Sequence, residues 1–180
     1  MYKIHERRQF VNSFLALFQK ICYAGESPLK ITHQEVKIMQ TAALVTGSSR
    51  GIGRAVALEL ARQGWDLCIN YHERADAAAE TAQAVRALGR RAITVQADVS
   101  DRSAVGAMVE RCQAELGEIG VLVNNAGVAG QALFQDVDDA LWDRYFGVNL
   151  QGARNTVQAV LPAMLHEKRG SIVNISSIWG

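Results

Sequence analysis

A regular alternation of short apolar runs and longer segments with helical periodicity is the feature that most restricts how this 180-residue chain can fold. It predicts buried strands at residues 42–46, 66–71, 91–96, 119–124 and 171–176. Helices are predicted at residues 52–63, 75–88, 101–116 and 138–166. Because strand and helix alternate with short links, the strands should run parallel, with helices on both faces. We therefore expect an α/β fold built on a doubly wound parallel sheet, which binds ligands at the carboxyl ends of its strands.

Charge and cysteine content exclude several other classes of protein. Nineteen Lys and Arg against 18 Asp and Glu give a formal net charge of +1, which argues against a nucleic-acid partner held through its phosphates. No segment approaches the roughly 20 apolar residues of a membrane span. The three cysteines, Cys22, Cys68 and Cys112, are too widely spaced for a zinc site or a disulfide framework. The sequence therefore predicts a soluble cytoplasmic protein without a metal, membrane or nucleic-acid partner.

The first 38 residues differ in composition from the rest of the chain. They contain one of the 15 glycines, and apolar residues at helical spacing between Phe10 and Ile21 permit one short amphipathic helix. No small-residue cleavage site follows the short apolar run, which disfavours a secretory signal peptide. Residues 34–39 can be back-translated into a purine-rich ribosome-binding sequence ahead of an ATG codon at Met39. We therefore treat residues 1–38 as an N-terminal extension, with the hypothesis of a misassigned leader, and residues 39–180 as the domain.

A glycine-rich turn joins the first predicted strand to the first predicted helix. Residues 47–53 have the spacing Gly-x-x-x-Gly-x-Gly, which differs from the Gly-x-Gly-x-x-Gly of the general dinucleotide fingerprint. Glycines at such a turn let backbone N–H groups approach a pyrophosphate at the positive end of the helix. Taken alone, the same turn also suits a tight strand-to-helix connection without a ligand.

Four further motifs follow in order along the chain. They are Asp98-Val99, Asn-Asn-Ala-Gly at 124–127, Val-Asn-Leu-x-Gly at 148–152, and Ile-Ser-Ser at 175–177. Together with the glycine-rich turn they resemble the classical short-chain dehydrogenase/reductase family over residues 39–180. The closest general likeness is to bacterial 3-oxoacyl-[acyl-carrier-protein] reductases. The resemblance implies a Rossmann fold with a nicotinamide cofactor.

The resemblance also implies a role for each cofactor motif. The pyrophosphate and the adenosine ribose would be cradled by Gly47, Ser49, Arg50, Gly51, Ile52 and Gly53. Asp98 and Val99 would contact adenine, although Asp98 also suits a helix cap, a role for which Ser100 and Asp101 compete. The cofactor cleft would be lined by Asn125, Ala126 and Gly127, while Asn124 would brace the sheet.

The end of the second predicted strand bears on which cofactor is used. NAD-binding sites usually place an acid about 20 residues beyond the glycines, where it binds the ribose 2′-OH. Here the strand ends Asn70-Tyr71-His72 without an acid; Glu73 lies slightly too late, and a strand end one or two residues further along would make it the acid. The guanidinium of Arg50 can pair with a 2′-phosphate. The sequence therefore favours NADP over NAD, with Asn70 and Tyr71 counted among the cofactor-binding residues.

The resemblance implies only part of a catalytic site. In the family, a tyrosine transfers the proton, and a lysine four residues later lowers the pKa of its phenol. Ser177 matches the serine that binds the substrate oxygen, and Asn149 matches the asparagine that holds a water in the proton relay. The residues four positions after the four tyrosines are Glu6, Ser27, Ala75 and Asn149, none of them lysine. Because the family's tyrosine would lie beyond residue 180, we expect a C-terminally truncated enzyme, inactive as these 180 residues alone.

The expected reaction passes a hydride between nicotinamide and a carbonyl or alcohol substrate, with a 3-oxoacyl thioester as the candidate. Full-length family members form homodimers or homotetramers. The absent part of the fold should leave apolar side chains of the long helix exposed, around Val157, Val160, Leu161 and Met164. Two alternatives stay open: a non-catalytic NADP-binding sensor or partner-binding module, which the missing tyrosine suits, and a methyltransferase, which would want an acid after the second strand.

Overall fold

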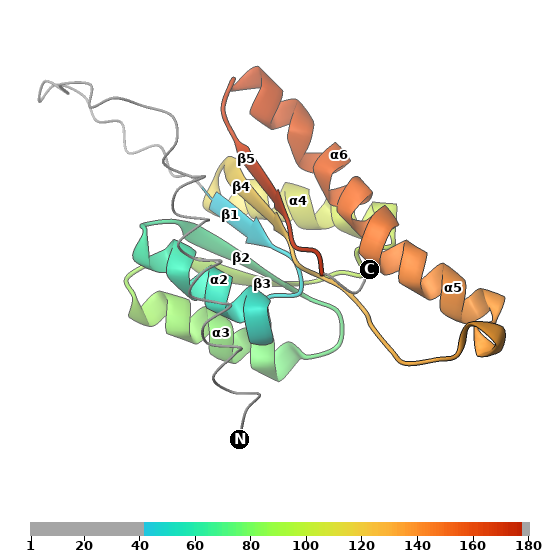
Figure 1. Ribbon diagram of the computed structural model, residues 1–180. Helices are drawn as coiled ribbons and strands as arrows, with labels where there is room; N and C mark the ends of the chain where they lie inside the picture. The colour runs from blue at the N-terminus through green and yellow to red at the C-terminus, as the bar shows by residue number, and fades with distance from the viewer. Residues whose placement is uncertain (1–41, 178–180) are drawn as a thin grey trace, which may run out of the picture. The chain divides into compact units, whose positions relative to one another are not determined.

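The computed structural model describes residues 42–177, and in this range five strands form a parallel sheet in the order β3-β2-β1-β4-β5 (Figure 1). The strands are β1 (Ala42–Val45), β2 (Asp66–Tyr71), β3 (Ala92–Gln96), β4 (Ile119–Asn124) and β5 (Ser171–Asn174). The helices are α2 (Gly51–Arg62), α3 (Ala75–Ala87), α4 (Arg102–Leu116), α5 (Asp139–Phe146) and α6 (Gly152–His166), with a 3₁₀ turn η1 (Phe134–Asp136) and a π-helical turn η2 (Gly147–Gln151). The predictions for residues 1–38 and Met39 fall outside the described residues.

Helices cover both faces of this sheet. On one face α2 and α3 pack against β1, β2 and β3, and on the other face α4 and α6 pack together, with α6 against β4 (Figure 1). Every residue of β1 is fully buried, and side chains such as Met108 and Cys112 of α4 and Val160 of α6 complete the core on their face. None of the helices within residues 42–177 is long and apolar enough to span a membrane. The arrangement confirms the predicted doubly wound α/β fold.

The path of the chain across the sheet reverses between β1 and β4. The chain passes from β1 outward to β2 and β3, then returns to form β4 on the other side of β1 and continues to β5. At such a switch point, the connections that leave the carboxyl ends of the two central strands go to opposite faces of the sheet. Doubly wound sheets bind their ligands there, so the residues after β1 and β4 are the first place to look for a site.

The long helix expected at residues 138–166 begins as predicted and is helical throughout residues 139–166, but a π-helical turn interrupts its α-helical hydrogen bonding. Asp138 caps α5 by accepting a hydrogen bond from the N–H of Leu141 at 2.8 Å, and the π-helical η2 then separates α5 from α6. Asn149 of η2 hydrogen-bonds the backbone of Val128, and Gly152, directly after η2, packs so closely against Val99 that an added Cβ would lie 2.6 Å from its Cγ2. Both contacts are tertiary, so a pattern of helical periodicity does not reveal the π turn.

The last strand is shorter than predicted. β5 ends at Asn174, whereas the sequence predicts a strand to residue 176. The N–H of Ile175 still donates to Asn124 O at 2.8 Å, but β4 ends at Asn124, so β5 has no further partner on that side. Beyond this point Asn125 turns to the loop after β1, where its side-chain amide is bound. The other strands match their predicted bounds to within one residue.

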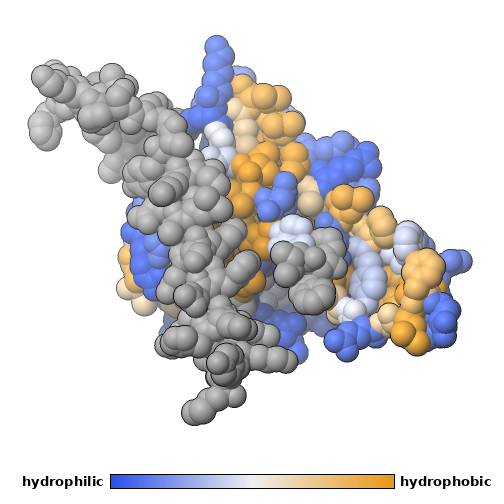
Figure 2. All heavy atoms as spheres, in the orientation of Figure 1, coloured by the Kyte–Doolittle hydropathy of each residue, from blue (hydrophilic) through white to orange (hydrophobic). Residues whose placement is uncertain are grey.

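The exposed apolar side chains of the helices after β4 match the expectation only in part: Leu161 is exposed and Val157 is half-buried. Val160 and Met164 are buried, at 1% and 6% exposure, because they face the sheet from α6, so the expectation that they are exposed is wrong. Apolar side chains do gather on the surface along α5 and α6 (Figure 2). The large exposed ones in this region are Trp142, Phe146, Leu150, Leu161 and Leu165.

Candidate functional site

The loop between β1 and α2 has the backbone that the glycine-rich turn predicts. Gly47 and Gly51 have φ angles of +62° and +58°, a left-handed conformation that residues with a side chain rarely adopt. A Cβ added to Gly47 would lie 2.9 Å from the Cα of Ala126, so this glycine packs against the loop after β4. A Cβ on Gly51 would meet nothing within 4 Å. Gly51 therefore leaves the start of α2 open to a ligand.

Thr46 and Asn125 tie the β1–α2 loop to the loop after β4. Thr46 Oγ1 accepts hydrogen bonds from the N–H groups of Asn125 at 3.0 Å and Ala126 at 2.9 Å. Asn125 Nδ2 donates in return to the carbonyl oxygens of Thr46 at 2.9 Å and Gly47 at 3.1 Å. Glycine is needed at position 53, because a Cβ on Gly53 would collide with the Asn125 amide and lie 2.6 Å from Gly47 O. The two loops at the switch point form one hydrogen-bonded unit.

The start of α2 is suited to an anion. No side chain caps it and its first turn has no acid, whereas Asp101 caps α4 and Asp138 caps α5. Backbone N–H groups and the positive end of the helix dipole attract negative charge at such a position. Arg50 and Ile52 are exposed here, while Ser49 is 7% exposed and its carbonyl accepts a hydrogen bond from Thr81. The loop therefore fits the pyrophosphate of a dinucleotide.

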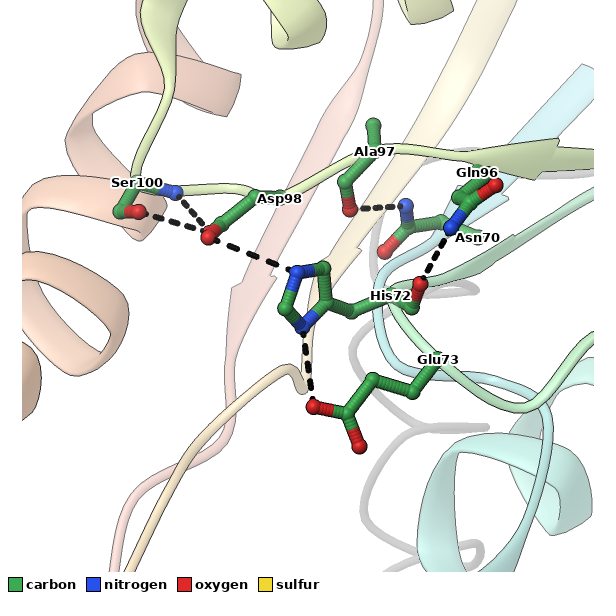
Figure 3. Close-up of polar contacts among 7 residues, drawn as sticks. All are labelled: Asn70, His72, Glu73, Gln96, Ala97, Asp98 and Ser100. Atoms are coloured by element: carbon green, nitrogen blue, oxygen red, sulfur yellow. Dashed lines mark hydrogen bonds and ion pairs between the residues drawn. The ribbon is translucent and has the colours of Figure 1, made fainter.

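Asn70, which the sequence places among the cofactor-binding residues, supports the β1–α2 loop from β2. Its side-chain Oδ1 accepts a hydrogen bond from the N–H of Gly47 at 3.1 Å, and its backbone carbonyl accepts the N–H of Ser48 at 2.9 Å. Its Nδ2 donates to Ala97 O at 3.1 Å (Figure 3) and also to Val95 O at 3.4 Å. Asn70 is 2% exposed with both polar atoms of its side chain engaged, so it positions Gly47. Its neighbour Tyr71 is half-buried at the end of β2.

The residues after β3 divide between core and surface. Val99 is 5% exposed and packs in the core, which leaves Asp98 as the more accessible member of the predicted adenine-binding pair. Asp98 Oδ1 accepts hydrogen bonds from the N–H of Ser100 at 2.9 Å and its hydroxyl at 2.7 Å, whereas the helix cap is Asp101. Burial acts to raise the pKa of Asp98, but the hydrogen bonds from Ser100 and the nearby His72 outweigh it and lower the pKa. The Asp98 carboxylate is thus preorganised in its charged form.

Of the two expected catalytic residues, Asn149 is held firmly. Asn149 Nδ2 donates to Val128 O at 3.0 Å, and its Oδ1 accepts the N–H of Val128 at 2.8 Å. A Cβ added to Gly127 would lie 3.3 Å from the same Oδ1, so Asn149 lies against the loop after β4. Ser177 is exposed and follows the end of β5, which pairs with β4 in parallel, so both residues lie toward the carboxyl-end edge of the sheet. Residues 42–177 contain no group of three His, Cys, Asp or Glu side chains able to hold a metal ion.

Two structural roles lie outside what the motif spacing predicts. Thr46 is the acceptor that joins the two loops, and its signal in the sequence is a hydroxyl at the end of an otherwise apolar run. Thr156 on α6 donates to Asn124 Oδ1 at 2.6 Å, and Asn124 Nδ2 donates to Asn174 Oδ1 at 2.9 Å. These two bonds link β4, β5 and α6, as expected for a residue that braces the sheet, although nothing in the sequence singles out Thr156.

A doubly wound parallel sheet, with a glycine-rich loop held open over a helix start at its switch point, defines the Rossmann-type dinucleotide-binding proteins. Within that class, a family model described as short chain dehydrogenase matches residues 41–180. This chain therefore belongs to the short-chain dehydrogenase family.

Relatives of known name agree with this assignment. The chain is 38% identical over 142 residues to the 3-oxoacyl-[acyl-carrier-protein] reductase FabG of Staphylococcus aureus strain Mu50, which covers 79% of this chain and 58% of that protein. It is 42% identical over 141 residues to the short-chain dehydrogenase/reductase FrzI of a Cladobotryum species, covering 78% and 54%. A solved structure from Sinorhizobium meliloti 1021, assigned by name to the short-chain alcohol dehydrogenases, matches with a TM-score of 0.74 at 38% identity, covering 77% and 54%. The chain thus spans little more than half the length of these relatives.

Proposed function

We propose that this chain binds NADP(H) at the carboxyl-end edge of its sheet, as the cofactor-binding part of an oxidoreductase. The observation that carries the proposal is the pair of braced loops at the switch point. Gly51 leaves the uncapped start of α2 open, while Thr46 and Asn125 hold the loop against the one after β4. A dinucleotide requires close approach of the backbone to its pyrophosphate, and this cradle offers it in preformed shape.

Preference for NADP rests on the charges around this cradle. Arg50 is exposed, and within residues 42–177 no hydrogen bond or ion pair engages its guanidinium. β2 ends at Tyr71 and is followed by His72, so the strand itself ends without an acid, and the nearest acid, Glu73, is two positions beyond it. A phosphate monoester carries a charge of about −1.5 to −2 at neutral pH. The free guanidinium can pair with it bidentately.

Titration of the 180-residue chain with NADPH and NADH, followed by nicotinamide fluorescence, tests this proposal. Arg50→Ala should raise the Kd for NADPH by about tenfold, because hydrogen bonds to charged groups contribute roughly 1.5–3 kcal/mol, and should change the Kd for NADH by less than about twofold. Arg62→Ala is the matched control: Arg62 lies at the other end of α2, paired with Glu59, and its loss should affect neither nucleotide. Equal losses of NADPH and NADH affinity in Arg50→Ala would refute the NADP assignment.

The proposed reaction is hydride transfer between nicotinamide and a carbonyl or alcohol carbon, with a 3-oxoacyl thioester as the candidate substrate because the staphylococcal relative is named for one. A bound nicotinamide would supply or accept the hydride. Ser177 would donate a hydrogen bond to the substrate oxygen, and Asn149 would hold a water in the proton relay, while its side chain is engaged by the backbone of Val128. No tyrosine of the 180 residues is followed four positions later by lysine, so we propose that these residues alone do not turn over substrate.

A non-catalytic role, as an NADP-binding sensor or partner-binding module, is the second candidate, although the matching Asn149 and Ser177 would have no purpose in it. NADPH oxidation by the 180-residue chain with a 3-oxoacyl thioester, lost in Ser177→Ala, would contradict both this candidate and the inactivity proposed above. A reading frame that continues into Tyr-x-x-x-Lys would decide for the oxidoreductase.

We also propose a cytoplasmic location for this chain and its association with a second copy. Cys68 and Cys112 are free, buried thiols, which supports a reducing, cytoplasmic environment. The exposed apolar side chains of α5, η2 and α6 support association with a second copy of the chain, since single-chain proteins rarely leave such a group of side chains in water. Sedimentation at several concentrations tests the second point, and a monomer at every concentration would contradict it.

A further inference from the structure

His72, the first residue after β2, lies between two carboxylates (Figure 3). Its Nε2 is 3.7 Å from Asp98 Oδ2, and its Nδ1 is 3.7 Å from Glu73 Oε1. Both distances are long for a hydrogen bond but short enough for an ion pair when the imidazole is protonated. Gln96 Nε2 also donates a hydrogen bond to the backbone carbonyl oxygen of His72 at 2.8 Å. A charge on the ring therefore acts on both acids.

The two acids differ in their freedom to move. Asp98 is held by the N–H and the hydroxyl of Ser100, at 2.9 Å and 2.7 Å. The Glu73 side chain is 75% exposed, and within residues 42–177 its carboxylate has no partner other than His72. Loss of charge on His72 therefore releases Glu73, whereas Asp98 stays in place.

These residues stand beside the cradle proposed for the cofactor. Asn70, two positions before His72, binds the N–H groups of Gly47 and Ser48, which joins the end of β2 to the β1–α2 loop. Dinucleotide-binding folds hold the adenosine ribose at this strand end, with an acid on the 2′-OH of NAD or a basic group near the 2′-phosphate of NADP. His72 and Glu73 supply one group of each kind.

We propose that His72 makes the choice between NADP and NAD depend on pH, an inference that rests on the nucleotide-binding function proposed above. When its ring is protonated, His72 attracts the 2′-phosphate and holds Glu73 away from the ribose. When the ring is neutral, that attraction is lost, and Glu73 is free to accept a hydrogen bond from the 2′-OH of NAD. Histidine is the side chain that changes charge between about pH 5 and 8, so the preference shifts within the physiological range.

The other charged side chains around this strand end do not change with His72. They lie after β2 and β3 and at the starts of α2, α3 and α4: Arg50, Arg54, Glu73, Arg74, Asp76, Asp98, Asp101 and Arg102. Carboxylates and guanidinium groups keep their charge above about pH 5. Arg50 therefore attracts the 2′-phosphate in both charge states of His72, and a protonated His72 adds to this attraction. The 2′-phosphate itself loses its second proton at about pH 6, so the test has to separate the titration of the phosphate from that of His72.

The test is a fluorescence titration with NADPH and NADH at about pH 6 and about pH 8 on the 180-residue chain and on His72→Gln. The preference for NADPH is the Kd for NADH divided by the Kd for NADPH. Dividing this preference in the unchanged chain by the same preference in the variant cancels the effect of phosphate ionisation. We expect this quotient to be about three to five at the lower pH, the effect of one exposed ion pair, and about one at the higher pH. The same quotient at both pH values overturns the inference.

Two further variants sharpen the result. Glu73→Gln should weaken NADH binding about threefold at the higher pH and leave it unchanged at the lower pH; an unchanged NADH affinity at both overturns the role of Glu73. His166→Gln is the matched control, because His166 on α6 also has an acidic neighbour, Glu167, at 3.1 Å, and its quotient should stay at one. If neither nucleotide binds the unchanged chain, the proposed function fails together with this inference. If NADPH is preferred but the His72 quotient does not vary, only the role of His72 fails.

Discussion

Replacement of Thr46 by valine tests whether the bonds between the β1–α2 loop and the loop after β4 stabilise the site. Valine has nearly the shape of threonine but lacks its hydroxyl. Thr46 is 1% exposed, and its Oγ1 accepts hydrogen bonds from the N–H groups of Asn125 and Ala126 at 3.0 Å and 2.9 Å. The change therefore removes the acceptor for two backbone donors and keeps the packing.

The expected loss of stability follows from the burial of those two donors. An N–H group that loses its acceptor inside a protein costs about 1–3 kcal/mol. Asn125 and Ala126 are half-buried, so water can partly replace the hydroxyl, and we take the low end for each. Thr46→Val should then lower the free energy of unfolding by about 2 kcal/mol. Thr46→Ser keeps the hydroxyl and removes one methyl group, which costs about 0.8 kcal/mol.

Urea unfolding followed by far-UV circular dichroism measures both losses, and a parallel titration with NADPH measures the site. Thr46→Val should also weaken NADPH binding, because the two hydrogen bonds from the loop after β4 to the Thr46 hydroxyl are lost. Thr46→Ser keeps them and should bind NADPH as the unchanged chain does. If the valine and serine variants lose the same stability and bind NADPH equally well, the hydroxyl contributes nothing and the reasoning is refuted.

Two further predictions concern helix glycines and an acid at a helix start. Gly53→Ala should weaken NADPH binding about tenfold or more, because the added methyl group meets the Asn125 amide. Gly106→Ala in α4 should instead stabilise the fold by about 0.5–1 kcal/mol, because a Cβ at this position meets nothing within 4 Å. Thermal denaturation measures the stability of both variants, and titration with NADPH measures their binding. If both variants change stability and NADPH affinity in the same way, the packing argument is contradicted. Hydrogen bonds from the Ser103 side chain and from backbone N–H groups lower the pKa of Asp101 from its ordinary 3.8. The charged Asp101 therefore contributes to stability above pH 3.8, and this contribution is lost as the pH falls through the lowered pKa. Asp101→Asn should keep the helix cap near neutral pH and reduce this acid-induced loss in urea titrations; an unchanged pH profile would speak against the cap.

The strands and most helix bounds were predictable because local chemistry governs them. A strand covered on both faces has to be apolar throughout, so runs such as residues 42–45 and 119–124 stand out from their polar surroundings. Helix starts and stops carry their own signals, such as Asp101 and Asp138 at the caps and glycine after α4. Each of these signals acts within a few residues of the element that it marks.

The site also had a local part that the motifs predicted. The spacing of Gly47, Gly51 and Gly53 marks the loop because only glycine tolerates the positive φ angles and the close approach found there. The order of the later motifs placed Asn125 and Asn149 after β4 and on the long helix, where the structure has them. The side-chain partners of these residues did not follow from that order.

Which residues face the ligand and which support them was decided by the tertiary structure. Asn70 and His72 are only two positions apart at the end of β2, yet Asn70 is buried and bound to Gly47, whereas His72 is exposed between two acids. Thr46 meets Asn125 across 79 residues because β1 and β4 are adjacent in the sheet, and the π turn exists where Asn149 binds Val128. Apolar periodicity specifies which face of an element is buried, but a hydrogen bond between distant side chains depends on which strands become neighbours, and that is settled only when the whole sheet assembles.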